Sequence, residues 1–119
     1  MNRVRIMLVD DDYDFRVCLA IDLKGYGCLV HQFENGRVAL DAASDGSVEF
    51  DILVTDWKMP LRYGDELIEE LREGGFTQPM ILWSSNLPLP KCVDATLVLG
   101  KNVGLSGLTA AIRQCLQTP

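Results

Sequence analysis

The chain alternates between short apolar runs and longer amphipathic stretches. Five runs have the length and composition of β-strands, and several lack both helical spacing and strict alternation, which is typical of strands buried on both faces. The predicted strands cover residues 4–9, 28–33, 52–55, 79–83 and 96–99. Four other segments place apolar residues at helical spacing. The predicted helices cover residues 14–25, 38–46, 65–73 and 105–117.

The first predicted helix shows the signals used to place all four. Its apolar stripe consists of Phe15, Cys18, Leu19 and Leu23. Asp14 places a negative charge at the helix start, where the backbone dipole is positive. Lys24 and Gly25 follow the stripe and predict the end of the helix.

The alternation of strands and helices predicts the fold. No internal repeat or low-complexity tract interrupts it, so we expect an α/β protein with a doubly wound, five-stranded parallel sheet. The exception is the segment 86–96, where Pro88 and Pro90 leave too little uninterrupted chain for a regular helix. We therefore expect the fourth helix of the series to be shortened, irregular or absent.

Composition limits the architecture and the partners. With 119 residues, 48% of them hydrophobic, the chain fits a single domain, residues 1–119, whose core is large enough to fold unaided. A net charge of −6 argues against direct nucleic-acid binding. The amino-terminal residues have neither the pattern of a signal peptide nor the length of a membrane span.

The four cysteines lack the short spacing of a zinc or redox motif. They are Cys18, Cys28, Cys92 and Cys115. Each lies among apolar neighbours, and we interpret them as reduced core thiols. Reduced thiols predict a cytoplasmic protein.

Polar residues whose side chains can bind ligands or take part in reactions follow four of the five predicted strands. These residues are Asp10, Asp11, Asp56, Ser84 and Lys101. Right-handed crossovers bring the carboxyl ends of parallel strands to one edge of the sheet, which is where ligands bind in open α/β folds. We therefore expect the five side chains to form one site.

Three carboxylates at one site repel one another, so a cation is expected among them. Carboxylate oxygens without histidine or thiol ligands favour Mg²⁺ over zinc. Lys101 and Ser84 add an ammonium and a hydroxyl, groups that stabilise a phosphoryl group in transit. The predicted reaction is phosphoryl transfer onto Asp56.

The same positions carry a family resemblance that covers almost the whole chain. The residues that carry it are Asp10, Asp11, Asp56, Met59, Pro60, Gly64, Ser84 and Lys101. In this order and at these strand ends, they resemble the receiver domain of bacterial response regulators. The resemblance implies a flavodoxin-like receiver fold and a place in two-component signal transduction.

The resemblance implies roles for the acidic residues. Asp56 matches the phosphoacceptor, which takes a phosphoryl group from a phosphohistidine on a histidine kinase or a phosphotransfer protein. Asp11 matches the direct Mg²⁺ ligand, and Asp10 acts beside it or through water. The backbone carbonyl of Lys58 matches a third protein ligand of the metal.

Two further residues match the switching machinery of the family. Lys101 matches the lysine that contacts the phosphoryl group, and Ser84 matches the hydroxyl that moves to bond it. In the family this movement changes a protein–protein output surface read by a downstream effector protein or domain. The resemblance thus implies a signalling phosphoacceptor that promotes its own phosphorylation and dephosphorylation, and not a classical enzyme.

Three features depart from the family pattern. Asn102 follows Lys101, where the family commonly has a proline in a cis peptide. Val98 stands where the family often has an aromatic switch residue. The third is the proline-bearing segment 86–96, which replaces part of the usual output surface.

Other functions stay open as alternatives. A receiver-like binding module that no longer cycles phosphate would keep the fold and work through contacts alone. An aspartate-dependent phosphatase would carry a second acidic residue two positions after the nucleophile, where this chain has Lys58. Nucleotide binding is not among these alternatives, because the sequence lacks a glycine-rich phosphate loop. Trp57 and Trp83 are interpreted as packing or rim residues.

Overall fold

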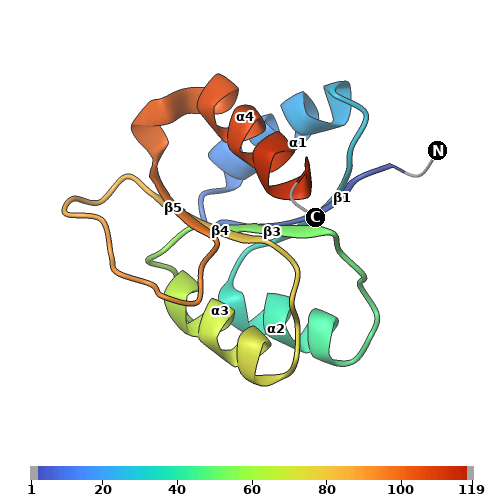
Figure 1. The fold of residues 1–119 in the computed structure, drawn as a ribbon, viewed down its shortest axis with the longest axis vertical. Helices are drawn as coiled ribbons and strands as arrows, with labels where there is room; N and C mark the ends of the chain where they lie inside the picture. The colour runs from blue at the N-terminus through green and yellow to red at the C-terminus, as the bar shows by residue number, and fades with distance from the viewer. Residues whose placement is uncertain (1–2, 118–119) are drawn as a thin grey trace.

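A parallel sheet of five strands organises the molecule, as a computed structural model that describes residues 3–117 shows (Figure 1). The strands are β1 (Arg5–Val9), β2 (Leu29–Phe33), β3 (Ile52–Thr55), β4 (Met80–Ser84) and β5 (Leu97–Gly100). They lie in the order β2-β1-β3-β4-β5, and every neighbouring pair is parallel. The doubly wound sheet predicted from the sequence is confirmed, and no strand boundary differs from the prediction by more than one residue.

The helices lie in two layers. They are α1 (Tyr13–Gly25), α2 (Gly36–Ser44), α3 (Gly64–Glu73) and α4 (Gly104–Gln117), and a short 3-10 helix, η1 (Lys101–Val103), precedes α4. Figure 1 shows α1 and α4 on one face of the sheet and α2 and α3 on the other. None of the helices within residues 3–117 is long and apolar enough to cross a membrane.

Each face of the sheet carries its own hydrophobic core. In β1, Ile6 and Leu8 pack under α1 and α4, whereas Met7 and Val9 pack under α2 and α3. This alternation follows from the period of two in a strand. The central strands β1, β3 and β4 are buried on both faces, which explains why their sequences, apart from Arg5 at the start of β1, show no polar positions before their carboxyl ends.

The cysteine prediction was wrong in part. Cys115 is buried in the core, Cys28 and Cys92 are partly buried, and Cys18 is exposed. Cys18 therefore does not belong to the apolar stripe of α1, whose buried positions are Arg16, Leu19, Ala20 and Leu23. The helix starts at Tyr13, one residue earlier than predicted, because the carboxylate of Asp12 accepts a hydrogen bond from the amide of Phe15 and caps it.

The connection between β4 and β5 contains no helix among the described residues. Of the shortened, irregular or absent helix that the sequence predicts, the structure has the last, with turns and bends from Ser85 to Thr96. The two prolines in the segment account for this, because proline lacks a backbone donor and clashes with the preceding turn of a helix. Cys92 and Ala95 of the segment pack against the core beside α3, in the layer that a helix would otherwise complete.

Arg72 at the end of α3 holds this irregular segment in place. Its guanidinium donates to the backbone carbonyls of Phe76, Gln78 and Asp94, at 3.0, 2.8 and 3.0 Å. Nη2 also lies 3.5 Å from Oγ1 of Thr96. One side chain therefore ties the loop before β4 to the loop before β5, and substitutes for the packing of a regular helix.

We expect Arg72→Met to loosen the segment 85–96 selectively. Hydrogen bonds to a charged donor contribute more than neutral ones, so the free energy of unfolding should fall by about 2 kcal/mol. Amide hydrogen exchange should rise in residues 85–96 before it rises in β1 or β3. Arg37→Met is the matched control, because Arg37 is exposed and makes only a surface ion pair with Asp41. Equal unfolding free energies for the two variants would contradict the role of Arg72.

Candidate functional site

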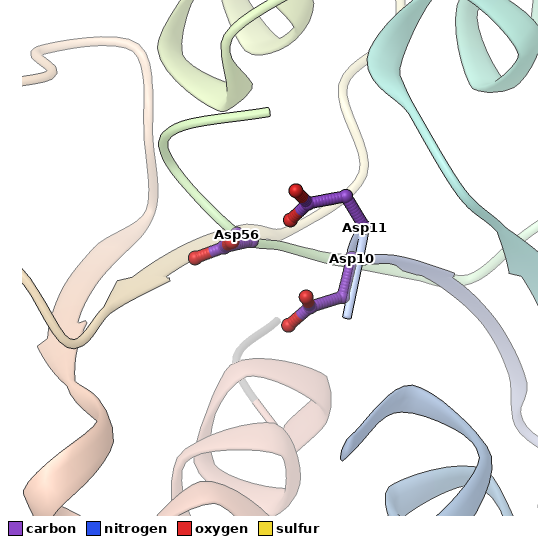
Figure 2. A group of neighbouring side chains, drawn as sticks. All are labelled: Asp10, Asp11 and Asp56. Carbon is purple, nitrogen blue, oxygen red and sulfur yellow. The ribbon is translucent and has the colours of Figure 1, made fainter. Parts of the chain in front are cut away.

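The acidic residues predicted from the sequence converge at the carboxyl edge of the sheet. Asp10 and Asp11 follow β1, and Asp56 follows β3. One carboxylate oxygen from each of the three residues lies within 4.8 Å of the others. Figure 2 shows the side chains of Asp10 and Asp11 pointing toward the side on which Asp56 lies. The parallel topology places them there, because β1 and β3 are neighbours in the sheet.

Asp10 is the buried anchor of the cluster. Its side chain is 1% exposed, and its two carboxylate oxygens have different partners. Oδ1 accepts from the amide of Asp12 at 3.0 Å, and Oδ2 accepts from Nζ of Lys101 at 2.9 Å. The backbone carbonyl of Asp10 accepts from the guanidinium of Arg16 at 2.8 Å. Asp11, in contrast, is exposed, which leaves its carboxylate accessible from solvent.

Asp56 occupies a buried position whose charge is poorly compensated. Burial and the charge of Asp10 raise the pKa of Asp56 from its ordinary value of 3.8 to about 6, although Lys101 opposes this shift. The carboxylate is therefore mostly ionised at neutral pH, but at a cost in free energy. A cation beside it would remove that cost.

Lys101 supplies the only positive charge that the described residues place between Asp10 and Asp56. Its Nζ lies 2.9 Å from Asp10 and 3.3 Å from Asp56. Burial by itself lowers the pKa of Lys101, but the hydrogen bond and charge of Asp10, together with Asp56, outweigh it, and the pKa is raised. The ammonium stays charged. Lys101 reaches the site although Asn102 follows it, because η1 turns the chain at this point.

Ser84 ends β4 at the same edge, and its side chain is buried. Its hydroxyl accepts from the amide of Asn86 at 2.9 Å and lies 3.4 Å from the Asn86 side-chain oxygen. The Ser84 hydroxyl thus makes its hydrogen bonds within the loop that follows β4. A turn toward Asp56 would exchange these bonds for new ones.

The loop after β3 is shaped by a close contact between Asp56 and α3. Gly64, the first residue of α3, donates to the carbonyl of Trp57 at 2.6 Å. A Cβ atom at Gly64 would lie 1.9 Å from the Asp56 carbonyl oxygen, so only glycine fits. The side chain of Lys58 lies over the ring of Trp57, with Nζ 4.8 Å from the ring centroid. This ammonium therefore makes a cation–π contact with the neighbouring ring.

The cluster suits a hard divalent cation. The three carboxylates and Lys101 together leave an excess of two negative charges, which matches Mg²⁺. The candidate group contains only carboxylate ligands, and its exposed member Asp11 leaves room for the water molecules that Mg²⁺ retains. The residues present therefore fit the ion that the sequence predicts.

Comparison with known proteins decides the family. A model of the response regulator receiver domain matches residues 6–113. The chain belongs to this family. It is 35% identical over 99 residues to the two-component response regulator ORR41 of Oryza sativa subsp. japonica, a match that covers 82% of this chain and 77% of that protein. It is also 46% identical over 68 residues to a response regulator receiver protein of Anaeromyxobacter sp. (strain Fw109-5), covering 57% of this chain and 28% of the relative.

Solved receiver domains share its fold. The response regulator TrrA of Thermotoga maritima, determined in complex with Mg²⁺ and beryllium fluoride, superposes with a TM-score of 0.85 at 25% identity. The match covers 95% of this chain and 99% of that one. This receiver domain spans only 20% of another relative, the DNA-binding transcriptional regulator NtrC of Escherichia coli (strain K12).

The sequence interpretation missed residues that lie around Lys101. It assigns Phe15 only to a helix stripe and Trp83 only to packing, yet both rings lie within 6 Å of the Lys101 ammonium. It does not single out Arg16, although this side chain donates to the Asp10 carbonyl. The alternation of side chains along β4 could have indicated the position of Trp83. Successive residues of a strand point to opposite faces of the sheet, so Trp83 and Ser84 face different layers, and Trp83 faces α1.

Proposed function

We propose that this receiver domain is the phosphoacceptor of a two-component pathway. Asp56 takes a phosphoryl group from a histidine kinase or a histidine phosphotransfer protein in a Mg²⁺-dependent reaction. The observation that carries the proposal is the geometry of Asp56, a buried carboxylate of raised pKa with Asp10, Asp11 and the Lys101 ammonium within contact range. Phosphorylation then changes a protein–protein output surface.

Each residue of the site has its own role in phosphoryl transfer. A carboxylate oxygen of Asp56 attacks phosphorus, the bond from phosphorus to the donor imidazole nitrogen breaks, and the electron pair stays on that nitrogen. Asp10, Asp11, Asp56 and the backbone carbonyl of Lys58 would hold Mg²⁺, which neutralises charge on the transferring group when bound. Lys101 donates to the phosphoryl oxygens. Ser84 leaves Asn86 to bond the phosphoryl group and so reports its presence.

Relatives indicate the kinds of partner. The longer relatives include a DNA-binding transcriptional regulator, which supports a downstream effector protein or domain as the reader of the output surface. The net charge of −6 argues against nucleic-acid binding by this chain itself. The solved complex of TrrA with Mg²⁺ and beryllium fluoride supports Mg²⁺ as the cofactor. The four free cysteines support a cytoplasmic location.

Incubation with acetyl phosphate and Mg²⁺ tests the proposal directly. We expect intact mass spectrometry to show the gain of one phosphoryl group, and no gain in Asp56→Asn or in the presence of EDTA. Trp57 adjoins the acceptor, so its fluorescence should change with Mg²⁺ and beryllium fluoride. If the unsubstituted protein shows neither change, the phosphate-independent binding module is the correct function.

Substituting Lys101 should separate metal binding from phosphoryl transfer. Lys101→Met removes the one ammonium that Asp10 and Asp56 share, so Mg²⁺ should bind several-fold more tightly, on the order of 1 kcal/mol for a charge lost near a partly screened site. Labelling by acetyl phosphate should nevertheless be slower, because no cation then contacts the phosphoryl oxygens. Isothermal titration and a labelling time course measure the two effects. Lys24→Met, at the exposed end of α1, is the control.

A further inference from the structure

Two aromatic rings lie close to the Lys101 ammonium, in addition to the carboxylates of Asp10 and Asp56. Its Nζ lies 4.4 Å from the centroid of the Phe15 ring and 5.9 Å from that of Trp83. Both distances fall within the range of cation–π attraction. The two rings also contact each other, with centroids 5.7 Å apart and planes inclined at 42°. The ammonium therefore has two carboxylates and two ring faces within reach.

The rings are fixed by the fold and do not depend on Lys101 for their positions. Trp83 lies within β4, is 2% exposed, and pairs with Leu99 of β5. Phe15 lies in the first turn of α1 and packs against the same core layer. The flexible side chain of Lys101 thus ends beside two aromatic rings that the fold holds in place.

The chain after Lys101 does not restrict the lysine in the way that a proline would. Asn102 follows it, and the backbone turns into the short helix η1. A lysine side chain has four rotatable carbon–carbon bonds, so groups around the ammonium must select its conformation. Phe15 and Trp83 are placed to do so, together with the carboxylates of Asp10 and Asp56.

We propose that Phe15 and Trp83 are positioning residues that hold the Lys101 ammonium against Asp10 and Asp56. The inference rests on the proposed function only for its effect on phosphoryl transfer, because the contact between the rings and the ammonium can be measured without phosphorylation. Since Trp83 directly precedes Ser84, the rings also link the lysine to the strand that carries the switching hydroxyl. The face of an aromatic ring attracts a cation, whereas a leucine in place of the ring would offer only apolar contact.

A double-mutant cycle in the metal-free protein tests the contact itself. Phe15→Leu and Lys101→Met are measured singly and together by urea unfolding. We expect the effects to be non-additive, with a coupling of roughly fivefold in the unfolding constant, as for a partly buried cation–π pair. Phe15→Leu combined with Lys24→Met is the matched control and should be additive. Additive effects in the Lys101 cycle would overturn the proposal. If Phe15→Leu lacks a cooperative transition, Phe15→Met takes its place.

Phosphorylation kinetics provide the second measurement. Labelling by acetyl phosphate should be roughly fivefold slower in Phe15→Leu and restored in Phe15→Tyr, which keeps the ring face. In the Lys101→Met background, Phe15→Leu should have no further effect on the rate. Two outcomes would reject the positioning role and leave a structural role alone. One is slow labelling of Phe15→Tyr, and the other is an equal loss of labelling rate from Phe15→Leu in the unsubstituted and the Lys101→Met proteins. Absence of labelling in the unsubstituted protein would reject the proposed function, and the unfolding cycle would still decide this inference.

Discussion

Gly64→Ala should destabilise the protein by about 3 kcal/mol, a large effect for the addition of one methyl group. The new Cβ would lie 1.9 Å from the carbonyl oxygen of Asp56 and 2.8 Å from Cδ1 of Leu82. The first neighbour is backbone, which cannot rotate away as the end of a side chain can. The start of α3 must therefore separate from the loop that carries Asp56.

The same substitution should weaken Mg²⁺ binding, because the displaced loop carries both Asp56 and the Lys58 carbonyl. Urea unfolding and Mg²⁺ titration of Trp57 fluorescence measure the two effects. Gly25→Ala is the matched control: nothing lies within 4 Å of the position that its methyl group would occupy, and the residue ends α1. Alanine there should stabilise the protein by up to about 1 kcal/mol. Similar unfolding free energies and Mg²⁺ affinities for the two variants would show that the backbone around Gly64 can move to accommodate a methyl group at little cost.

Asp56→Asn should stabilise the metal-free protein at high pH by about 2–3 kcal/mol. The pKa of Asp56 is about 6 in the folded protein against an ordinary value of 3.8, so the folded state holds the proton more tightly. Stability is therefore lost as the pH rises from about 4 through 6, and the deficit persists above that range. The difference between these two pKa values corresponds to roughly 3 kcal/mol. Asparagine removes the charge and with it the deficit.

Urea unfolding in EDTA from pH 4 to pH 8 measures this prediction. The difference between Asp56→Asn and the unsubstituted protein should be smallest near pH 4 and reach its plateau above pH 7. Mg²⁺ should then stabilise the unsubstituted protein more than the variant. Asp22→Asn, an exposed position on α1, should change stability by less than about 0.5 kcal/mol at every pH. A pH-independent difference would exclude the raised pKa as its cause.

The arrangement of the acidic cluster was predictable from the sequence because it depends on few physical facts. Buried parallel strands produce continuous apolar runs, and such runs place Asp10, Asp56 and Lys101 at strand ends without ambiguity. A shift of a residue or two in a strand boundary does not move a side chain away from that edge. The pairing of the acidic cluster with a lysine therefore followed from topology alone.

Other features were not predictable because they depend on contacts between distant side chains. The phase of an amphipathic helix is set by what covers it, and Cys18 lies outside the buried stripe for that reason. The prolines predicted an irregular segment after β4, but nothing local indicated that Arg72 of α3 would bind its carbonyls. Cation–π contacts of Lys101 likewise need three elements in place at once, namely α1, β4 and η1.

The contact between Lys101 and Asp10 joins residues 91 positions apart in the chain. Asp10, Asp11 and Asp56 all lie in the first half of the sequence, whereas their counter-charge follows the last strand. During synthesis, Lys101 is made after all three aspartates, so the acidic cluster lacks this counter-charge until the chain beyond β5 has been added. A chain truncated before Lys101 would therefore present carboxylates that repel one another.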